Sequence, residues 1–526
     1  MSLTAIRTSL PPFFIPRKLA AATAGVLAAA VLAGCGTVQV QPLAQDTLEQ
    51  QAARDREAAL ANVPPLAGKL SMDEAIARAL KYNLDRRTRL MEEALAMNQL
   101  DTANLDMLPR VMSNAGYTWR DKELVTRSVD SVTGRPSLAN PYISSERSHA
   151  AYDLGLTWNM LDFGMSYLTA KQGADRVLIA AERRRKAMHV LIADVRTAFW
   201  RTASAQKLRD DVKRTIDMAE TALEDARKVE NERLRSPVDT LRYQRQLLEN
   251  LRLLESIEQE LASGRVELAS LINVPLGQDF EVVEPAGNMQ PALLDVPVAR
   301  LEELAVTQNA DLREQFYNGR IAVEETRKTM LRLFPNLSFN YDLRYDADKY
   351  LINNRWNDAG VHLSWNVMNL FTGPAQKRLA EAGVKLADQR RMATQMSVLT
   401  QVHLARLQYQ VAYRQYLRAD QIWQADAKIA EHVKNREAVE AQSKLEQVAN
   451  STTAILSLLR RYQSLAQLQS AGSRMQATVG LEPVLGSVSE LTLDQLTRDV
   501  GTSMRDWPKA LAKPAAPAPI PTTEQQ

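Results

Sequence analysis

Apolar residues first follow the period of a strand and then the period of a helix, and this handover occurs twice along the chain. From about 110 to 120 and from about 150 to 160 they occupy alternate positions, which predicts two strands with one apolar face. The same alternation returns at about 336–345 and 359–367. Strands of about ten residues, with polar side chains on one face and aromatic residues near the ends of the other, are typical of membrane barrels. A half-buried strand of an ordinary sheet would show the same alternation.

Each predicted pair of strands leads into a long segment that favours helix. Residues 174–236 and 384–471 contain neither Gly nor Pro and are rich in residues of high helix propensity. At ~1.5 Å per residue the first segment would extend for on the order of 100 Å, far longer than an average globular helix. Within it, apolar residues recur at spacings of four and three, the pattern of a coiled-coil seam, at Val212, Ile216, Ala219, Leu223 and Ala226.

The chain therefore contains one structural unit twice. Two offsets relate the copies, 226 residues upstream of the strands and 207 residues from the end of each strand pair onward. The first relates Asn83 to Asn309 and Leu108–Pro109 to Phe334–Pro335; the second relates Trp158 to Trp365, Ser236 to Ser443 and Asn273 to Gly480. A repeat of this length predicts helix, strand pair, long helix and return helix in each copy. Composition alone would allow one uninterrupted helix over 384–471, but the repeat predicts a turn at Ala441–Leu445.

Capping signals place the helix ends. Ser71 with Glu74 has the spacing of a capping box, and Ser236 before Pro237 predicts the start of the first return helix. Asn273 and Gly480 are expected to close the return helices in the left-handed conformation. The helix before the strands and the return helix are each about half as long as the long helix. We therefore expect these two short helices to stack end to end beside it.

The N-terminus has the pattern of a secretory signal peptide, residues 1–34. Basic residues precede an apolar run, Leu19–Leu32, which is too short for a spanning helix. The run ends in Leu-Ala-Gly-Cys, and Cys35 is the only cysteine of the 526 residues. This motif resembles the bacterial lipoprotein box, which implies lipidation (palmitate) at Cys35, and Gly36 in the next position implies the outer membrane. A membrane-targeting segment with a chance cysteine is the alternative.

Four further segments are expected after the signal peptide. Residues 35–65 form a lipidated leader, 66–290 the first repeat and 291–485 the second repeat. Residues 486–526 form a C-terminal segment, whose Pro- and Ala-rich part from Ala510 onward is expected to be disordered.

Composition and motifs give no sign of catalytic chemistry. Charged residues make up 24% of the chain and the net charge is +3, which argues against a nucleic-acid surface. The five histidines lack metal-ligand spacing, and no phosphate-binding loop or nucleophile motif occurs. We therefore expect no enzyme activity, no cofactor, no metal and no catalytic residue.

The order of these features, twice over, resembles the TolC family of outer-membrane efflux proteins, in its lipoprotein branch. The resemblance covers roughly residues 66–485. It is carried by the segment from Leu70 to Leu80 with Asn83, by Leu108–Pro109 and Phe334–Pro335 before the strands, and by 271–274 and 478–481 at the ends of the copies. It implies a mainly α fold with a small β part: a trimeric 12-stranded outer-membrane β-barrel, four strands per chain, continued by a long periplasmic α-helical barrel.

The resemblance also implies a function and partners. The protein would be the outer-membrane channel of a tripartite efflux or type I secretion system, a passive conduit opened when a periplasmic adaptor and an inner-membrane pump dock. The homotrimer agrees with strand counting, because four strands leave two open edges and one chain cannot close a barrel. The helical tips depart from the family, since no Gly precedes Ser236 or Ser443. A structural or adaptor-like coiled-coil envelope lipoprotein without a pore is the alternative.

Two further sets of residues are candidates for channel function. Aromatic residues expected on the lipid-facing surface of the barrel are Tyr117, Trp119, Trp158, Phe339, Tyr341 and Trp365. Near the helical tips, Arg233 or Arg235 is expected to pair with Glu437 or Glu440 of a neighbouring tip and hold the tunnel closed. Tip charges that merely stay solvated are the alternative.

Overall fold

The computed structural model describes residues 42–66, 68–136, 141–231, 236–285, 294–437, 444–481, 485, 488 and 490–512. The chain divides into two units, Met1–Asn62 and Val63–Gln526. In the first unit, the leader forms the helix α2 (Gln45–Leu60), none of whose residues is buried. Cys35 and the signal peptide lie outside the described residues. All elements below belong to the second unit.

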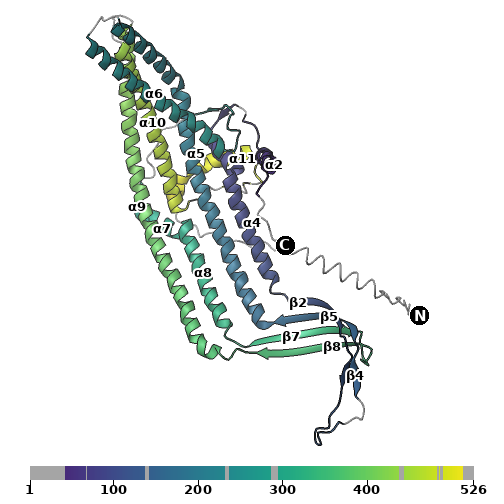
Figure 1. The fold of residues 1–526 in the computed structure, drawn as a ribbon. Coiled ribbons are helices and arrows are strands. Elements are labelled where there is room, and N and C mark those ends of the chain that lie inside the picture. Colours follow the sequence, from purple (N-terminus) through teal and green to yellow (C-terminus); the bar gives the residue numbers. More distant parts are fainter. Residues whose placement is uncertain are drawn as a thin grey trace, which may run out of the picture. The chain divides into compact units, whose positions relative to one another are not determined.

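One order of elements occurs twice in the second unit (Figure 1). The first copy consists of α3 (Met72–Tyr82), α4 (Leu84–Leu105), β2 (Arg110–Trp119), β5 (Ser148–Asn159), α5 (Met160–Asn231) and α6 (Pro237–Leu271). The second consists of α7 (Val298–Gln308), α8 (Ala310–Leu331), β7 (Asn336–Asp346), β8 (Arg355–Ser364), α9 (Asn369–Glu437) and α10 (Lys444–Val479). The long helices α5 and α9 have 72 and 69 residues, so each extends for roughly 100 Å.

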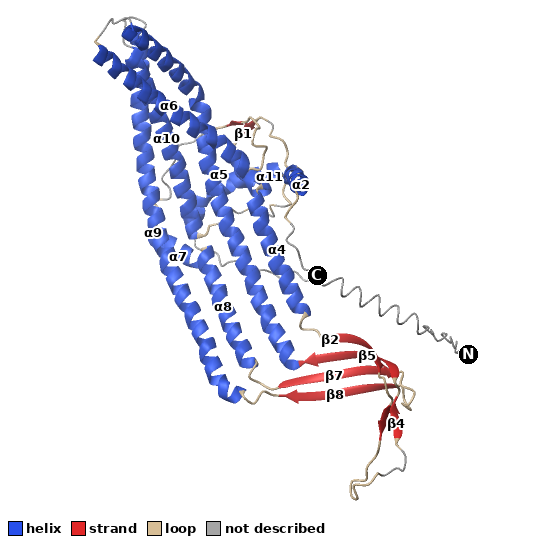
Figure 2. Ribbon diagram, in the orientation of Figure 1, coloured by secondary structure: helices blue, strands red, loops and turns tan. Residues whose placement is uncertain are grey.

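The short helices lie end to end beside the long ones, as expected (Figure 2). At the first joint, Nδ2 of Asn83 donates to the Leu271 carbonyl (3.1 Å), while Oδ1 accepts from the Arg86 N–H. Asn309 makes the same two bonds at the second joint, to the Thr478 carbonyl (2.9 Å) and from the Leu312 N–H. Both asparagines thus cap one helix and hold the end of another.

The return helices begin and end near the predicted places. Asn273 and Gly480 have φ values of 56° and 73°, which confirms the left-handed caps. Ser71 caps α3 by accepting from the Glu74 N–H, whereas the Glu74 side chain binds Arg78 instead of completing the box. In the second copy α9 and α10 are separate helices that pack side by side, so the uninterrupted helix is wrong. Of the turn predicted at Ala441–Leu445, Lys444 and Leu445 belong instead to α10, and the other three residues lie outside the described part of the chain.

Heptad positions form part of the core. Val212, Ala219 and Leu223 of α5 are buried in clusters with Leu247, Leu251, Leu254 and Ile257 of α6, and Ala226 is also buried. A larger cluster surrounds Phe199 and includes Ile76 of α3 and Leu268 of α6. No helix within the described ranges is long and apolar enough to cross a membrane.

The four long strands form one antiparallel sheet in the order β2-β5-β7-β8. Its register repeats: Arg110 lies opposite Thr157, and adding 226 and 207 to these numbers gives Asn336 and Ser364, which also lie opposite each other. The last strand was predicted at 359–367, but β8 ends at Ser364. There the chain turns, because the Trp365 indole donates to the Leu333 carbonyl and Asn366 accepts from the Met368 N–H.

Five described elements of the second unit were not predicted. The connection 121–147 contains a small hairpin of β3 (Leu124–Thr126) and β4 (Tyr142–Ser145). Strands β1 (Lys69–Leu70) and β6 (Glu281–Val282) pair in parallel. The C-terminal segment contains the helix α11 (Leu493–Ala512), which packs on α3 through fully buried Leu496 and Val500. Residues 510–512 are therefore helical, in contrast to the expected disorder; the rest of the tail lies outside the described residues.

Candidate functional site

The sheet has one apolar and one polar face. Its register aligns four apolar pairs across the central strands: Tyr152 with Tyr345, Leu154 with Leu343, Leu156 with Tyr341 and Trp158 with Phe339. Side chains of the same parity on the edge strands extend this face, and they include Tyr117 (71% exposed) and Val361 (62% exposed). A continuous exposed apolar surface of this kind marks contact with a membrane or another protein.

Aromatic pairs lie near both ends of the apolar face. Trp158 stacks on Phe339 with ring centroids 6.0 Å apart, and Tyr152 stacks on Tyr345 at 6.1 Å. The two pairs are six residues apart along each strand, roughly 20 Å at ~3.4 Å per residue. Outer-membrane barrels have an apolar band of about 25 Å between two aromatic girdles. The spacing therefore suits a sheet that crosses an outer membrane.

All but one of the aromatic residues that the sequence predicts on the lipid-facing surface lie on the apolar face of the sheet. Tyr117, Trp119, Trp158, Phe339 and Tyr341 share the apolar face, as their cross-strand partners show. Trp365 follows the end of β8 and is bonded to the Leu333 carbonyl. It lies at the sheet–helix junction, so the prediction that it belongs to the last strand was wrong.

Most side chains of the opposite face are polar, with Met112 and Trp356 as large apolar exceptions. Nδ2 of Asn114 donates to Asp153 (2.8 Å), and Arg344 lies 3.2 Å from Asp358 and 3.8 Å from Asp342. Gly155 leaves room for the Asp342 carboxylate, since a Cβ at that position would overlap it. The charged and amide groups of this face suit contact with water.

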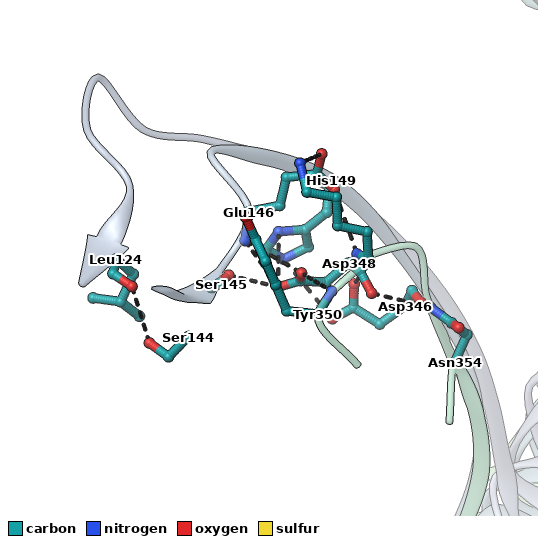
Figure 3. A network of polar contacts seen from close by, with 10 residues as sticks. Leu124, Ser144, Ser145, Glu146, His149, Asp346, Asp348, Tyr350 and Asn354 are labelled. Atoms are coloured by element: carbon teal, nitrogen blue, oxygen red, sulfur yellow. Dashed lines mark hydrogen bonds and ion pairs between the residues drawn. The ribbon is translucent and has the colours of Figure 1, made fainter. Parts of the chain in front are cut away.

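A buried carboxylate joins the two strand connections at the end of the sheet remote from the helices (Figure 3). Asp348 is 4% exposed and accepts hydrogen bonds from the Ser145 hydroxyl (2.7 Å) and the Glu146 N–H (3.2 Å). The His149 ring lies between the carboxylates of Asp348 and Asp346, 3.9 and 3.8 Å away. Burial raises the pKa of Asp348, but hydrogen bonds to its carboxylate outweigh that effect and leave the pKa below its ordinary value.

A ladder of ion pairs joins the two copies along the helices. It links α5 to α8 through Asp175–Arg320, Glu182–Arg313, Arg183–Glu314 and Lys186–Asp311, with distances of 2.5 to 2.8 Å. Asp175 and Glu182 are buried in this seam. Despite the cation of Arg320, burial raises the pKa of Asp175. These pairs hold the helices of the first repeat in register with those of the second; we call this layer of helices the helical wall.

The helices at the two lateral edges of this wall carry exposed apolar side chains. On α4 these are Met91, Leu95 and Leu105, and on α9 they are Leu379, Leu386 and Met396. Each of these six side chains is more than half exposed. The outer edges of the wall thus differ from the ion-paired seam inside it.

The residues expected at the helical tips are mostly outside the described part of the chain. Arg233, Arg235, Glu440 and Ser443 lie there, and Glu437 is the last residue of α9. Ser236 is the N-cap of α6, and its carbonyl accepts from the Thr240 N–H. The gate therefore stays a prediction. Within the described ranges, no group of three His, Cys, Asp or Glu side chains could hold a metal ion.

No protein-family model and no curated protein matches this sequence. Several solved structures share its fold. The CmeC outer membrane channel of Campylobacter jejuni has a TM-score of 0.60 at 12% identity over 82% of this chain and 89% of that chain. VceC of Vibrio cholerae has 0.56 at 12% over 78% and 96%, and the open state of MtrE of Neisseria gonorrhoeae has 0.55 at 15% over 78% and 88%. The chain thus has the fold of outer-membrane channel proteins.

Proposed function

We propose that the protein is a passive conduit across the outer membrane, formed by three copies and serving an efflux or type I secretion system. The observation that carries this proposal is the exposed apolar face of a four-stranded sheet with two open edges. An unpaired backbone group in hydrocarbon costs several kcal/mol, so the edges must pair with other copies. Two protomers give a barrel of eight strands, whose interior is filled by side chains. Three protomers give twelve strands and leave room for a passage.

The internal repeat supplies the register of the joint between copies. Leu154 of β5 lies opposite Leu343 of β7 within one chain. Adding 207 to the first number and subtracting 226 from the second places Val361 of β8 opposite Tyr117 of β2 in the next copy. The same offsets carry the β2–β5 register onto the β7–β8 register, which supports their use here. Both residues lie on the apolar face, where the joint would continue it.

The helical edges fit the same arrangement. Within one chain, α5 of the first repeat contacts α8 of the second, and there the Gln172 amide donates from Nε2 to the Ile321 carbonyl (3.2 Å). Adding 207 to 172 and subtracting 226 from 321 places Leu379 of α9 opposite Leu95 of α4 in the next protomer. These leucines are 76% and 57% exposed in the single chain. A second copy would cover both of them.

The remaining parts of the proposal rest on sequence. Lipidation of Cys35 would anchor the N-terminus in the outer membrane, and labelled palmitate should be absent from Cys35→Ser.

A periplasmic adaptor and an inner-membrane pump would dock at the helical tips and open them. Pairing of Arg233 or Arg235 with Glu437 or Glu440 would keep the tips closed. Conductance should rise in Arg233→Glu with Arg235→Glu and fall again when Glu437→Arg and Glu440→Arg are added.

The test combines conductance with a cross-link at the predicted joint. Purified trimers should conduct ions in a planar bilayer, whereas an envelope lipoprotein without a pore would not. Val361→Cys with Tyr117→Cys should give reducible dimers and trimers on mild oxidation. Val361→Cys with Trp119→Cys is the matched control, because it shifts the partner by two residues on the same face. Absence of conductance, or equal cross-linking in both variants, would contradict the proposal.

A further inference from the structure

One charged residue lies on the apolar face of the sheet. The strand residues of that parity are otherwise aliphatic, aromatic or uncharged polar, and the exception is Arg355, the first residue of β8. Tyr345 lies directly opposite it, and Tyr152 lies opposite Tyr345 on the next strand. Arg355 is therefore level with the aromatic pair at the end of the sheet remote from the helices.

The guanidinium of Arg355 is held by an aromatic ring and lacks an acidic partner in the described chain. Its central carbon is 5.5 Å from the centroid of the Tyr345 ring, a cation–π contact. None of the ion pairs among the described residues involves Arg355. Arg344, at the same level on the opposite face, lies near both Asp342 and Asp358. The charge of Arg344 is thus balanced by two carboxylates on the polar face, whereas no carboxylate of the described chain pairs with Arg355 on the apolar face.

A hollow lies beside this cation. Its volume is about 530 Å³, and seven of its ten lining residues belong to the apolar face, among them Ser113, Tyr152, Leu343, Tyr345 and Asn357. The other three lining residues, Asp153, Arg344 and Trp356, belong to the opposite face, where Arg344 is paired with Asp342 and Asp358. Such a hollow combines apolar walls, the hydroxyl and amide groups of Ser113 and Asn357, and the cation of Arg355. This is the chemistry that receives an amphiphile with an anionic head.

The depth of Arg355 in the membrane decides which anion it meets. An arginine on the lipid face of a barrel is strongly destabilising at the membrane midplane but has little effect near the interface. The outer aromatic girdle marks that interface, where the phosphates of outer-leaflet glycolipids lie. Arginine binds phosphate through paired N–H donors. A cation at this level is therefore tolerated and has an anion within reach.

We propose that Arg355 and the adjoining hollow bind a phosphate-bearing glycolipid of the outer leaflet, of the lipid A class. The phosphate accepts hydrogen bonds from the Arg355 guanidinium, and the lipid body lies against Tyr152, Tyr345 and Leu343. This inference rests on the proposed function, because it requires that the apolar face of the sheet contact the outer leaflet.

Native mass spectrometry of detergent-purified trimers would test the site, with bis-phosphorylated lipid A and its dephosphorylated form as probes. Wild type should retain the phosphorylated lipid, and Arg355→Gln should weaken retention at least about tenfold, the effect expected when one charge-assisted contact is lost. Arg355→Lys should retain an intermediate amount. Lys349→Gln is the matched control, because it removes a cation that is paired with Glu146 near the same end of the sheet and does not line the hollow, and it should bind like wild type. The dephosphorylated lipid should bind all variants equally weakly.

The outcomes separate this inference from the proposed function. Equal retention by wild type and Arg355→Gln, in trimers that conduct, would overturn the lipid site alone. Unchanged lipid retention with a weakened trimer would overturn the lipid site and show instead that Arg355 stabilises the joint between protomers, where the repeat offsets put Glu123 of the next protomer opposite it. A wild type that neither forms trimers nor conducts would overturn both.

Discussion

Gly480 packs against the backbone of Gln308, so closely that a Cβ at position 480 would overlap the Gln308 carbonyl. Gly480 also has a φ of 73°, where other residues are strained. The corresponding residue of the first copy, Asn273, has nearly the same backbone conformation with a side chain present. The two copies thus use one cap geometry, but the second alone has no space for a side chain.

Replacing Gly480 should therefore destabilise the protein more than replacing Asn273. In Gly480→Ala the strained φ and the overlap with a backbone atom combine, and we expect a loss of more than about 2 kcal/mol. Asn273→Ala, the matched control, should cost about 1 kcal/mol, because a residue with a Cβ already occupies this position and the substitution creates no overlap with the backbone. Thermal unfolding followed by circular dichroism would measure both. Equal midpoints for the two variants would show that Gln308 can move away.

The side chain of Asn309 offers a second test, because its two hydrogen bonds can be separated. Asn309→Asp keeps the acceptor for the Leu312 N–H but removes the donor to the Thr478 carbonyl. It would place a carboxylate oxygen against that carbonyl in a buried site. We expect Asn309→Asp to lower the unfolding midpoint at least as much as Asn309→Ala. An Asp variant as stable as wild type would show that the joint between α8 and α10 depends on capping alone.

Backbone signals made much of this fold predictable. Asn273 and Gly480 predicted the ends of the return helices. The alternation of apolar residues predicted the two faces of the sheet and placed Trp158 and Phe339 on the apolar face. The repeat also resolved the second helical hairpin, where composition alone failed. These features depend on local sequence or on the comparison of two copies of it.

What could not be predicted depends on contacts between distant segments. Asp348 is buried because Ser145 and Glu146, some 200 residues earlier, bind its carboxylate. The helix α11 did carry one overlooked local signal, a capping box in which the Thr492 and Gln495 side chains bind each other's N–H groups. The isolated charge of Arg355 on the apolar face became visible only with the strand register.

Buried His189 should make stability depend on pH. Burial, and to a smaller degree Arg185, lowers the pKa of His189 to about 4 in the folded protein. In the unfolded chain, His189 binds a proton near pH 6.5. The stabilisation that comes from a neutral, buried His189 is therefore fully present above that pH and is lost as pH falls through about 4. The shift corresponds to about 3 kcal/mol. Unfolding midpoints between pH 7 and pH 4 should fall less in His189→Met than in wild type. His403→Gln, at an exposed site, should follow wild type.

The carboxylate of Asp348 gives a separate pH dependence, at the end of the sheet remote from the helices. Its pKa is lower when folded than when unfolded, so its stabilisation is complete above about pH 4 and is lost as pH falls through the folded value. Asp348→Ala should remove the acceptor for Ser145 and Glu146 and loosen the connection 121–147 at neutral pH. Limited proteolysis of intact cells should then cleave this connection faster than in wild type.

The exposed ion pair Lys349–Glu146 provides the control for that experiment, because it lies in the same network at the surface. Surface pairs of this kind contribute little, so Lys349→Ala should be cleaved about as slowly as wild type. Ser145→Ala removes one hydrogen bond to Asp348 and should give an intermediate rate. If Lys349→Ala and Asp348→Ala were cleaved equally fast, the buried carboxylate would not be what joins the two strand connections.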